Sequence, residues 1–260
     1  MRDSTYSALF GAMSNEHRLG LIANNLANAN TTGFKKDQVA FHDTFQRFAH
    51  DYLVDSRSYL RDKNLWPQPD VMAKPRLSEQ RTDFSQGSLQ MTGNPLDLAI
   101  SGEGFFKVRT PDGDFLTRSG SFQLTSEGGI ISEQGFQLLG QGGPVLLPGG
   151  GNVLIDSLGQ VTVDGAVANI LDVVTVDDPS ALEKVGNNLY RIRPDSKASE
   201  TPVPPETRVE QGYIEKANVE VVTEMVAMIE VQRAFEMYQR MISGTSEMDK
   251  TVTDKVGSVV

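Results

Sequence analysis

The sequence predicts an α+β fold, with a long helix at each end of the chain and a central all-β domain of short antiparallel strands. Glycine distribution carries most of this prediction. Seventeen of the 24 glycines fall between Gly87 and Gly165, whereas residues 213–243 contain none. Because glycine permits turns and destabilises helix interiors, we expect turn-rich β structure in the middle and an uninterrupted helix near the C-terminus.

The C-terminal helix is predicted from the spacing of its apolar residues. Alternating steps of four and three residues draw one stripe down a helix, and the stripe comprises Ala227, Val231, Ala234, Tyr238, Met241, Thr245, Met248 and Val252. One flank is widened by Met225, Met228, Phe235 and Ile242. From about Val219 to Val252 such a helix would be about 50 Å long, which is too long for one compact domain of this size.

The N-terminal helix shows the same spacing over a shorter stretch. Its apolar residues recur at three- and four-residue steps, and they are Tyr6, Leu9, Phe10, Met13, Leu19, Ile22 and Leu26. Asparagine and glycine accept the left-handed conformation at a helix C-terminus. We therefore expect the helix to end in the Asn- and Gly-containing run at residues 28–33.

These patterns divide the chain into four predicted segments. Residues 1–34 form the N-terminal helix, and residues 35–85 form an extended connector with three prolines and no sustained period. Residues 86–205 form the central β domain, which a proline-rich run closes. Residues 206–260 contain the C-terminal helix.

The central domain is predicted from short apolar runs that alternate with turns. Glu127-Gly128-Gly129 and Asp164-Gly165 are typical turn sequences. Strands at spacings near ten residues indicate an antiparallel sheet, a sandwich or a partly open barrel. The strand candidates are residues 98–100, 105–108, 115–116, 130–131, 145–147, 153–155, 161–163 and 170–176.

Composition and charge exclude several function classes. The net charge is −10 and the pI is about 4.8, which argues against a nucleic-acid partner because phosphate binding needs a basic surface. The chain has no cysteine, so thiolate metal sites and cysteine nucleophiles are excluded. We expect no cleaved signal peptide and no membrane span, because no apolar run is long enough.

Residues with catalytic or cofactor-binding potential do not form a recognisable site. Gly102-Glu103-Gly104 lacks the context of a phosphate-binding loop, and no Gly-x-Ser-x-Gly sequence occurs. The three histidines are too few for a metal or acid–base site, so we expect no metal, cofactor, small-molecule substrate or catalytic residue. Aspartates at turns leave one enzymatic alternative open, a β-rich hydrolase acting on cell-wall glycan.

Apolar stripes at both chain ends predict assembly. An amphipathic helix needs a partner for its apolar face, and methionine packs well against dissimilar neighbours. Burying one large apolar side chain contributes about 1.5–3 kcal/mol, so a wide stripe provides a strong drive toward association. The alternative is a self-contained helical hairpin packed on the sheet.

Four sequence blocks resemble the bacterial flagellar rod and hook proteins. The first runs from residue 24 to residue 36, the second from 93 to 106, the third from 115 to 122, and the fourth from 211 to 236. They occur in order and span nearly the whole chain. The family motif in the first block comprises Asn24, Asn25, Leu26, Ala27, Asn28, Gly33 and Phe34.

This resemblance implies a structural, non-enzymatic subunit of the flagellar basal-body rod. Chain length and the single central domain are more similar to a rod protein than to the longer hook subunit, and the opening residues resemble the proximal-rod type. A distal-rod or hook subunit is the alternative. The resemblance implies that the terminal helices pair in an α-helical coiled-coil domain that lines a tube, with the β domain facing outward.

The same resemblance implies partners, location and mechanism. The partners would be other copies of the chain, other rod and axial proteins, and the flagellar export apparatus, which would deliver the chain to the periplasmic rod without a cleaved signal peptide. Interlocking helices would transmit torque from motor to hook. The residues expected to pack between subunits are Tyr6, Leu9, Phe10, Met13, Leu19, Ile22, Leu26, Met225, Met228, Val231, Ala234, Phe235, Tyr238, Met241, Ile242 and Met248.

Overall fold

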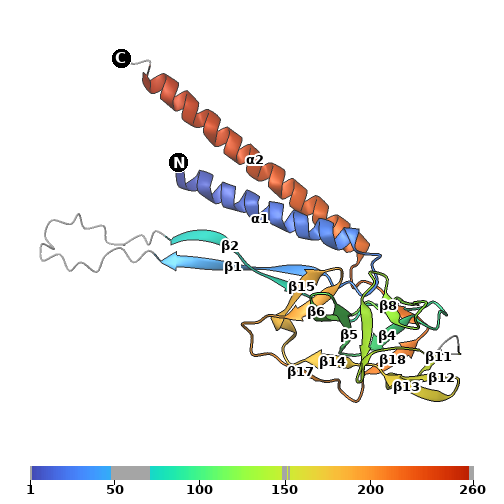
Figure 1. The fold of residues 1–260 in the computed structure, drawn as a ribbon. Coiled ribbons are helices and arrows are strands. Elements are labelled where there is room, and N and C mark those ends of the chain that lie inside the picture. The colour runs from blue at the N-terminus through green and yellow to red at the C-terminus, as the bar shows by residue number, and fades with distance from the viewer. Residues whose placement is uncertain (1, 48–70, 148–150, 152, 258–260) are drawn as a thin grey trace, which may run out of the picture. The chain divides into compact units, whose positions relative to one another are not determined.

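The computed structural model describes residues 2–47, 71–147, 151 and 153–257 (Figure 1). A helix lies at each end of the chain, and β structure fills the middle. The helices are α1 (Arg2–Ala27), α2 (Val221–Gly257) and the short 3-10 helix η2 (Pro179–Ala181). The early strands are β1 (Asp37–Arg47), β2 (Val71–Thr82), β3 (Leu89–Met91), β4 (Leu98–Ser101), β5 (Phe105–Thr110), β6 (Gly113–Thr117), β7 (Phe122–Leu124), β8 (Ile130–Ser132), β9 (Gln137–Gly140) and β10 (Gly143–Pro144). The later strands are β11 (Val153–Ile155), β12 (Gln160–Val163), β13 (Ala166–Ile170), β14 (Val173–Val176), β15 (Leu182–Gly186), β16 (Leu189–Ile192), β17 (Glu200–Pro202), β18 (Arg208–Gln211) and β19 (Tyr213–Glu215).

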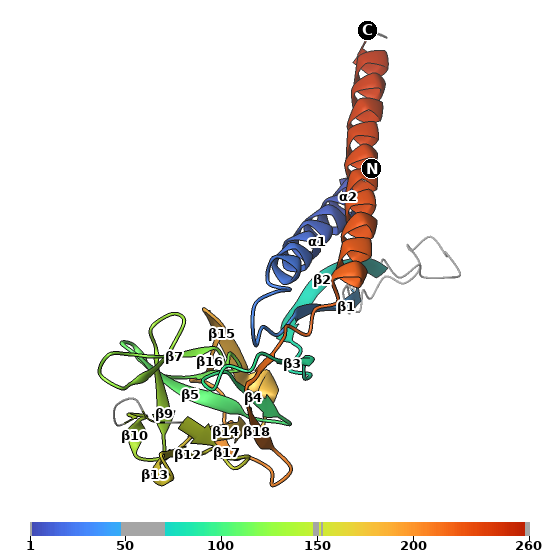
Figure 2. The same ribbon diagram turned by 90° about the vertical axis from the view of Figure 1, so that its right-hand side faces the viewer.

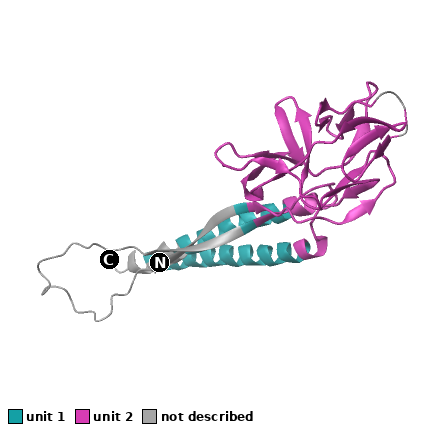
Figure 3. Cartoon of the chain, turned by 90° about the horizontal axis from the view of Figure 1, so that it is seen from below, with its two compact units in different colours: residues 1–23, 39–80, 225–260 teal, residues 24–38, 81–224 magenta. Residues whose placement is uncertain are grey.

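The chain divides into two compact units (Figure 3). The helical unit comprises residues 1–23, 39–80 and 225–260, and the β unit comprises residues 24–38 and 81–224. The chain therefore passes between the units four times. The four segments predicted from the sequence are a different division of the chain and stay a prediction.

The helical unit contains most of α1 and α2, which are 26 and 37 residues long. Strong helix formers and the absence of glycine before Gly244 explain the length of α2. One close approach between the helices is made by Gly11 and Tyr238, because a Cβ added to Gly11 would lie 2.7 Å from the Tyr238 ring. A glycine at this position therefore lets the aromatic ring lie against the α1 backbone.

The predicted coiled-coil domain is wrong. Among the described residues, close backbone approach between α1 and α2 does not extend along their length, and the ribbon shows two separate straight helices (Figure 1). A coiled coil needs large apolar residues at regular facing positions. In the first half of α1 the buried face instead carries the small residues Ala8, Ala12 and Ser14, whereas the large residues of this half are exposed.

Two strands occupy the described part of the predicted connector. β1 and β2 pair with each other in a two-stranded sheet. β2 contains Pro75, which cannot donate a ladder hydrogen bond and is tolerated in a strand that has a free edge. The base of this pair lies in the β unit, because Asp37, Gln38, Arg81 and Thr82 belong to that unit.

The β unit is built from antiparallel strand pairs. The largest sheet has ten strands, with the order β15-β16-β6-β5-β9-β8-β7 and with β10, β14 and β17 joined beside this path (Figure 2). A three-stranded sheet, β11-β12-β13, and the pairs β18-β4 and β19-β3 complete the unit. β18 and β19 come from the chain just before α2, so the first part of the fourth sequence block, residues 211–224, lies in the β unit.

Two hydrophobic clusters form the core of the β unit. The larger cluster includes Phe106 and Phe122, whose rings meet edge to face with centroids 5.6 Å apart. The smaller cluster joins Phe105 to Tyr190, with Phe84 packed against both rings. These side chains stabilise the sheet through apolar burial and aromatic contact.

Two of the predicted strands differ from the structure. The run 170–176 is interrupted at Leu171 and Asp172, because Leu171 N donates to Gly159 O and Asp172 N donates to Leu139 O. The run 145–147 forms no regular strand, although Val145 N and Leu147 N both donate to neighbouring backbone carbonyls. Burial of the side chains of Val145 and Leu147 explains why their sequence looks like a strand.

No helix among the described residues is long and apolar enough to cross a membrane.

Replacing Leu138 by alanine tests the core of the β unit. This side chain is fully buried in β9, so the Leu138→Ala variant should lose about 2–5 kcal/mol of unfolding free energy in urea denaturation. The matched control is Leu158→Ala, because Leu158 is 77% exposed and should change stability by less than about 0.5 kcal/mol. Equal losses in the two variants would contradict the assignment of the core.

Candidate functional site

The family motif leads directly from α1 into the β unit. α1 ends at Ala27, and residues 31–37, here called the strap, then lie against the β unit. Gly33 has φ +67°, and a Cβ at this position would lie 2.4 Å from the backbone of Arg118 and Ser119. Only glycine satisfies both the left-handed conformation and this close approach. Phe34 is buried beside it, with Lys184 Nζ 4.4 Å from the ring centroid.

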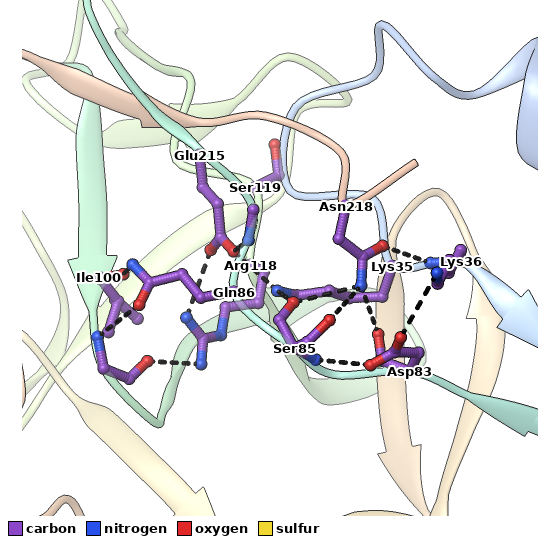
Figure 4. A network of polar contacts seen from close by, with 12 residues as sticks. Lys35, Lys36, Asp83, Ser85, Gln86, Ile100, Arg118, Ser119, Glu215 and Asn218 are labelled. Carbon is purple, nitrogen blue, oxygen red and sulfur yellow. Dashed lines mark hydrogen bonds and ion pairs between the residues drawn. The ribbon is translucent and has the colours of Figure 1, made fainter. Parts of the chain in front are cut away.

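Lys35, Arg118 and Glu215 form a buried ion triad (Figure 4). Lys35 Nζ lies 2.7 Å from Glu215 Oε1, and Arg118 Nη1 lies 3.3 Å from Glu215 Oε2. The three side chains are 0%, 4% and 1% exposed. Buried charges need compensating partners, and the Glu215 carboxylate is the shared counter-ion of two cations that come from distant parts of the chain.

Backbone groups complete the shell around the triad. Lys35 Nζ donates to Ser85 O at 2.7 Å, and Gly87 N donates to Glu215 Oε1 at 2.8 Å. A Cβ on Gly87 would collide with Lys216 O, so this glycine is required for the amide to reach the carboxylate. The triad thereby joins the strap to the segment after β2 and to β19.

A second ion pair fixes the far end of the strap. Lys184 Nζ lies 2.9 Å from Asp37 Oδ2 and donates to Lys35 O at 2.6 Å. Thr82 Oγ1 donates to Asp37 Oδ1 at 2.7 Å. β1 and β2 are therefore held together at their base through the Asp37 carboxylate.

Burial shifts the pKa values of the cations in this cluster. Desolvation lowers the pKa of Lys35, and the attraction of Glu215 opposes this only in part. Desolvation also lowers the pKa of Arg118 and of Lys184 against their carboxylate partners. Three cations share two carboxylates, Asp37 and Glu215, so the cluster holds one formal positive charge in excess.

Two asparagine side chains act as substitutes for backbone pairing. Asn25 Nδ2 donates to Asp37 O at 2.9 Å, and Asp37 N donates to Asn25 Oδ1 at 3.0 Å. Lys36 N donates to Asn218 Oδ1 at 2.7 Å, and Asn218 Nδ2 donates to Asp83 O at 2.8 Å. The end of α1 and the segment before α2 are thus both joined to the strap.

The candidate packing residues of α1 lie on different faces. Ile22 is buried and Leu19 and Leu26 are half-buried. The outer ridge of α1 comprises large side chains that are 41–57% exposed, namely Tyr6, Leu9, Phe10 and Met13. The chain itself covers mainly the face with small residues, and the role of these residues in subunit packing stays a prediction.

α2 is apolar on two faces. Val231 is buried, and partly buried on the same side are Met228, Ala234, Phe235, Tyr238 and Ile242. The outer ridge of α2 is 41–70% exposed and comprises Val221, Val222, Met225, Val226, Ile229, Met237, Met241 and Met248. Sequence reasoning named only Met225, Met241 and Met248 from this ridge. The signal for the others was a second apolar face at helical spacing.

Two of the aspartates on which the glycan hydrolase alternative rested form hydrogen bonds to nearby residues. Asp97 accepts hydrogen bonds from Thr92 Oγ1 and Asn94 Nδ2, and Asp178 accepts from Ser180 N. Within the described ranges, no three Asp, Glu or His side chains are grouped to hold a metal ion. His50 and the side chain of His42 lie outside the described residues.

The lowered pKa of Lys35 predicts a pH-dependent stability. Below 10.5, the ordinary pKa of lysine, the unfolded chain binds this proton more tightly than the folded chain does. The free energy of unfolding should therefore rise with pH, and we expect Lys35→Met to flatten this rise in urea denaturation from about pH 7 to 9.5. This pH range stays below the titration of Tyr190. Burial raises the pKa of Tyr190, so its contribution to the pH dependence of the unfolding free energy has the opposite sign.

Lys107→Met is the matched control for Lys35→Met. Lys107 pairs with Glu200, and its pKa is raised through a hydrogen bond and attraction to that carboxylate, which outweigh desolvation. The control should keep the wild-type rise with pH, because a raised lysine pKa acts only above the ordinary value. An unchanged slope in Lys35→Met would show that the triad does not destabilise the charged lysine.

Comparisons with known proteins cover both the strap and the helices. The model of the flagella basal body rod protein family matches residues 6–35, the flagellar hook protein FlgE/F/G D1 domain matches residues 99–169, and the flagellar basal body rod FlgEFG protein C-terminal domain matches residues 210–255. The first and third matches contain Lys35 and Glu215. Both terminal signatures thus contribute to the buried ion triad.

Full-length relatives carry the same assignment. The chain is 34% identical to the flagellar basal-body rod protein FlgF of Caulobacter vibrioides, over 100% of both chains. It is 32% identical to FlgF of Mesorhizobium japonicum, over 98% of this chain and 100% of that one. Identity to the rod protein FlgG of Buchnera aphidicola subsp. Schizaphis graminum is 30%, over 95% and 97% of the two chains. The chain therefore belongs to the family of flagellar basal-body rod proteins, and it resembles FlgF more than this FlgG.

Proposed function

We propose that this chain is a structural subunit of the flagellar basal-body rod, which polymerises through its terminal helices and forms part of the drive shaft between motor and hook. Membership of the rod protein family supports this function. The observation that carries the mechanism is the exposure of large apolar side chains on the outer ridges of both α1 and α2. Exposed apolar patches of this extent mark interaction surfaces.

Burial of the two ridges supplies the energy of assembly. Complete burial of one such side chain contributes about 1.5–3 kcal/mol, and the ridge residues retain between 41% and 70% of their exposure in the single chain. Neighbouring subunits that cover these ridges recover part of this free energy. The four methionines on the outer ridge of α2 allow packing against dissimilar subunits.

The mechanism is mechanical and contains no enzymatic step. Helices that interlock between copies resist rotation past one another, so torque applied at one end is carried along the shaft. We propose that the partners are further copies of this chain and other axial proteins, with the β unit on the outside of the rod. Export by the flagellar secretion apparatus without a cleaved signal is part of the same proposal.

We propose a proximal-rod position for this chain, and the pattern of identity supports it. A proximal-rod position is favoured by the two FlgF proteins. A distal-rod position is the second candidate, because FlgG of Buchnera aphidicola also matches 95% of this chain. Labelling the chain in purified basal bodies and measuring its distance from the hook by electron microscopy separates the two positions.

Charges on the outer ridge of α2 should abolish assembly without unfolding the chain. The double variant Ile229→Glu, Met241→Glu places two carboxylates where exposed side chains now stand. We expect an unchanged circular dichroism spectrum, because no buried group is altered. We also expect loss of motility and at least a tenfold loss of the chain from purified basal bodies, because burying the two unpaired charges in an interface would cost about 3 kcal/mol or more in total.

The control adds the same two charges to polar positions of the β unit. Gln123 and Gln141 are exposed there, so Gln123→Glu, Gln141→Glu should assemble as the wild type does. Normal motility in the ridge variant would refute polymerisation through this face of α2.

A further inference from the structure

The chain passes between its two units four times. These passages fall after residues 23, 38, 80 and 224. The parts of the β unit next to these passages are the end of α1, the start of β1, the end of β2 and the segment before α2. Each of them takes part in the hydrogen-bond network around the strap, and Figure 4 shows the part of this network that joins Lys36, Asp83 and Asn218.

Contacts connect these four parts in series. Asn25 joins the end of α1 to Asp37, and Asp83 N donates to Lys36 O at 2.9 Å. Asn218 joins the segment before α2 to both Lys36 and Asp83. A single network within the β unit therefore joins all four of these parts to one another.

Glu215 is the hub of this network. Its carboxylate pairs with the Lys35 side chain of the strap and with the Arg118 side chain. It also accepts a hydrogen bond from Gly87 N in the segment after β2. Its carbonyl oxygen also accepts from Gly33 N at 2.7 Å. Loss of the carboxylate would leave Lys35 and Arg118 buried with no counter-charge within the triad, which is strongly unfavourable.

The core of the β unit does not include the strap. Neither hydrophobic cluster has a buried member among residues 24–38. The strap is attached by ion pairs, hydrogen bonds and the single buried ring of Phe34. Regions held in this way commonly open as local units below the global unfolding free energy.

We propose that the strap, residues 83–87 and residues 215–218 form one cooperative latch. It opens as a whole, with Phe84 leaving the smaller cluster and Glu215 leaving the end of β19, while the ten-stranded sheet of the β unit stays folded. Closure of the latch fixes all four segments that leave the β unit, and its opening releases all four together. Glu215 holds the latch by charge, and Gly33 holds it by allowing the strap to touch the backbone at Arg118. This inference concerns the isolated chain and does not depend on assembly.

Hydrogen exchange of the full-length chain, measured by mass spectrometry with peptide-level resolution, tests the latch. In Glu215→Gln, the amides of Gly33, Lys36, Asp37, Asp83 and Gly87 should exchange at least about tenfold faster, and by a similar factor. Amides that donate to carbonyls of β9, such as those of Val145 and Asp172, should keep their wild-type rates.

A second variant opens the latch without changing any charge. Gly33→Ala introduces a Cβ that collides with the backbone at Arg118 in a strained conformation, so it should accelerate the same amides as Glu215→Gln. The matched control is Glu183→Gln, which breaks an exposed pair with Arg191 whose side chains are 36% and 51% exposed. We expect this control to leave the latch amides unchanged.

Two results would overturn the proposal. If acceleration in each variant is confined to amides beside the substitution, the latch is not cooperative. If either variant unfolds the sheets along with the strap, the strap is an integral part of the domain and not a latch. Faster exchange of the common set in both variants, with protected sheets, supports the proposal.

Discussion

The two terminal helices carry more apolar surface than the described part of the chain covers, and this constraint governs the rest of the molecule. α1 turns a small-residue face toward its own chain and leaves Tyr6, Leu9, Phe10 and Met13 exposed. α2 buries Val231 on one side and exposes Ile229 and Met237 on another. A helix that is apolar on two faces is typical of a position between layers. In the assembly that we propose, neighbouring subunits supply the remaining layer.

The β unit complements these helices by supplying a folded, self-sufficient core. Its phenylalanines and branched residues are buried without help from a partner. The ends of both helices are attached to this core through charged and amide groups, with Glu215 at the centre. Buried ion pairs give little net stability compared with apolar packing, but breaking one is costly. In this chain the triad fixes where segments lie, whereas apolar burial supplies the stability.

The sequence was sufficient to predict the helices and much of the β structure, because both depend on local spacing. A glycine-free run with apolar residues at steps of three and four predicts α2 from one segment alone. Turn residues likewise divide the strands. The coiled coil could not be judged in this way, since periodicity shows which residues share a face and not which face the chain itself covers.

The ion triad was not predicted for a different reason. Lys35, Arg118 and Glu215 are separated by more than 80 residues, and only the folded chain brings them together. Each lies in a block that resembles the rod family, but polar residues stand beside all three, so no local pattern distinguishes them. The interruption at Leu171 and Asp172 also depends on distant backbone partners, Gly159 and Leu139.

Solvent access to the outer ridge of α2, measured before and after assembly, shows whether neighbouring subunits cover this ridge. The chain has no cysteine, so Met241→Cys provides a single site for maleimide labelling, and Lys197→Cys, at an exposed position of the β unit, shows that the reagent reaches the assembled rod. If neighbouring subunits cover the ridge, Met241→Cys will be labelled rapidly in the isolated chain and strongly protected in purified basal bodies. Lys197→Cys will be labelled in both states. Equal labelling of Met241→Cys in the two states would contradict burial of the ridge by neighbouring subunits.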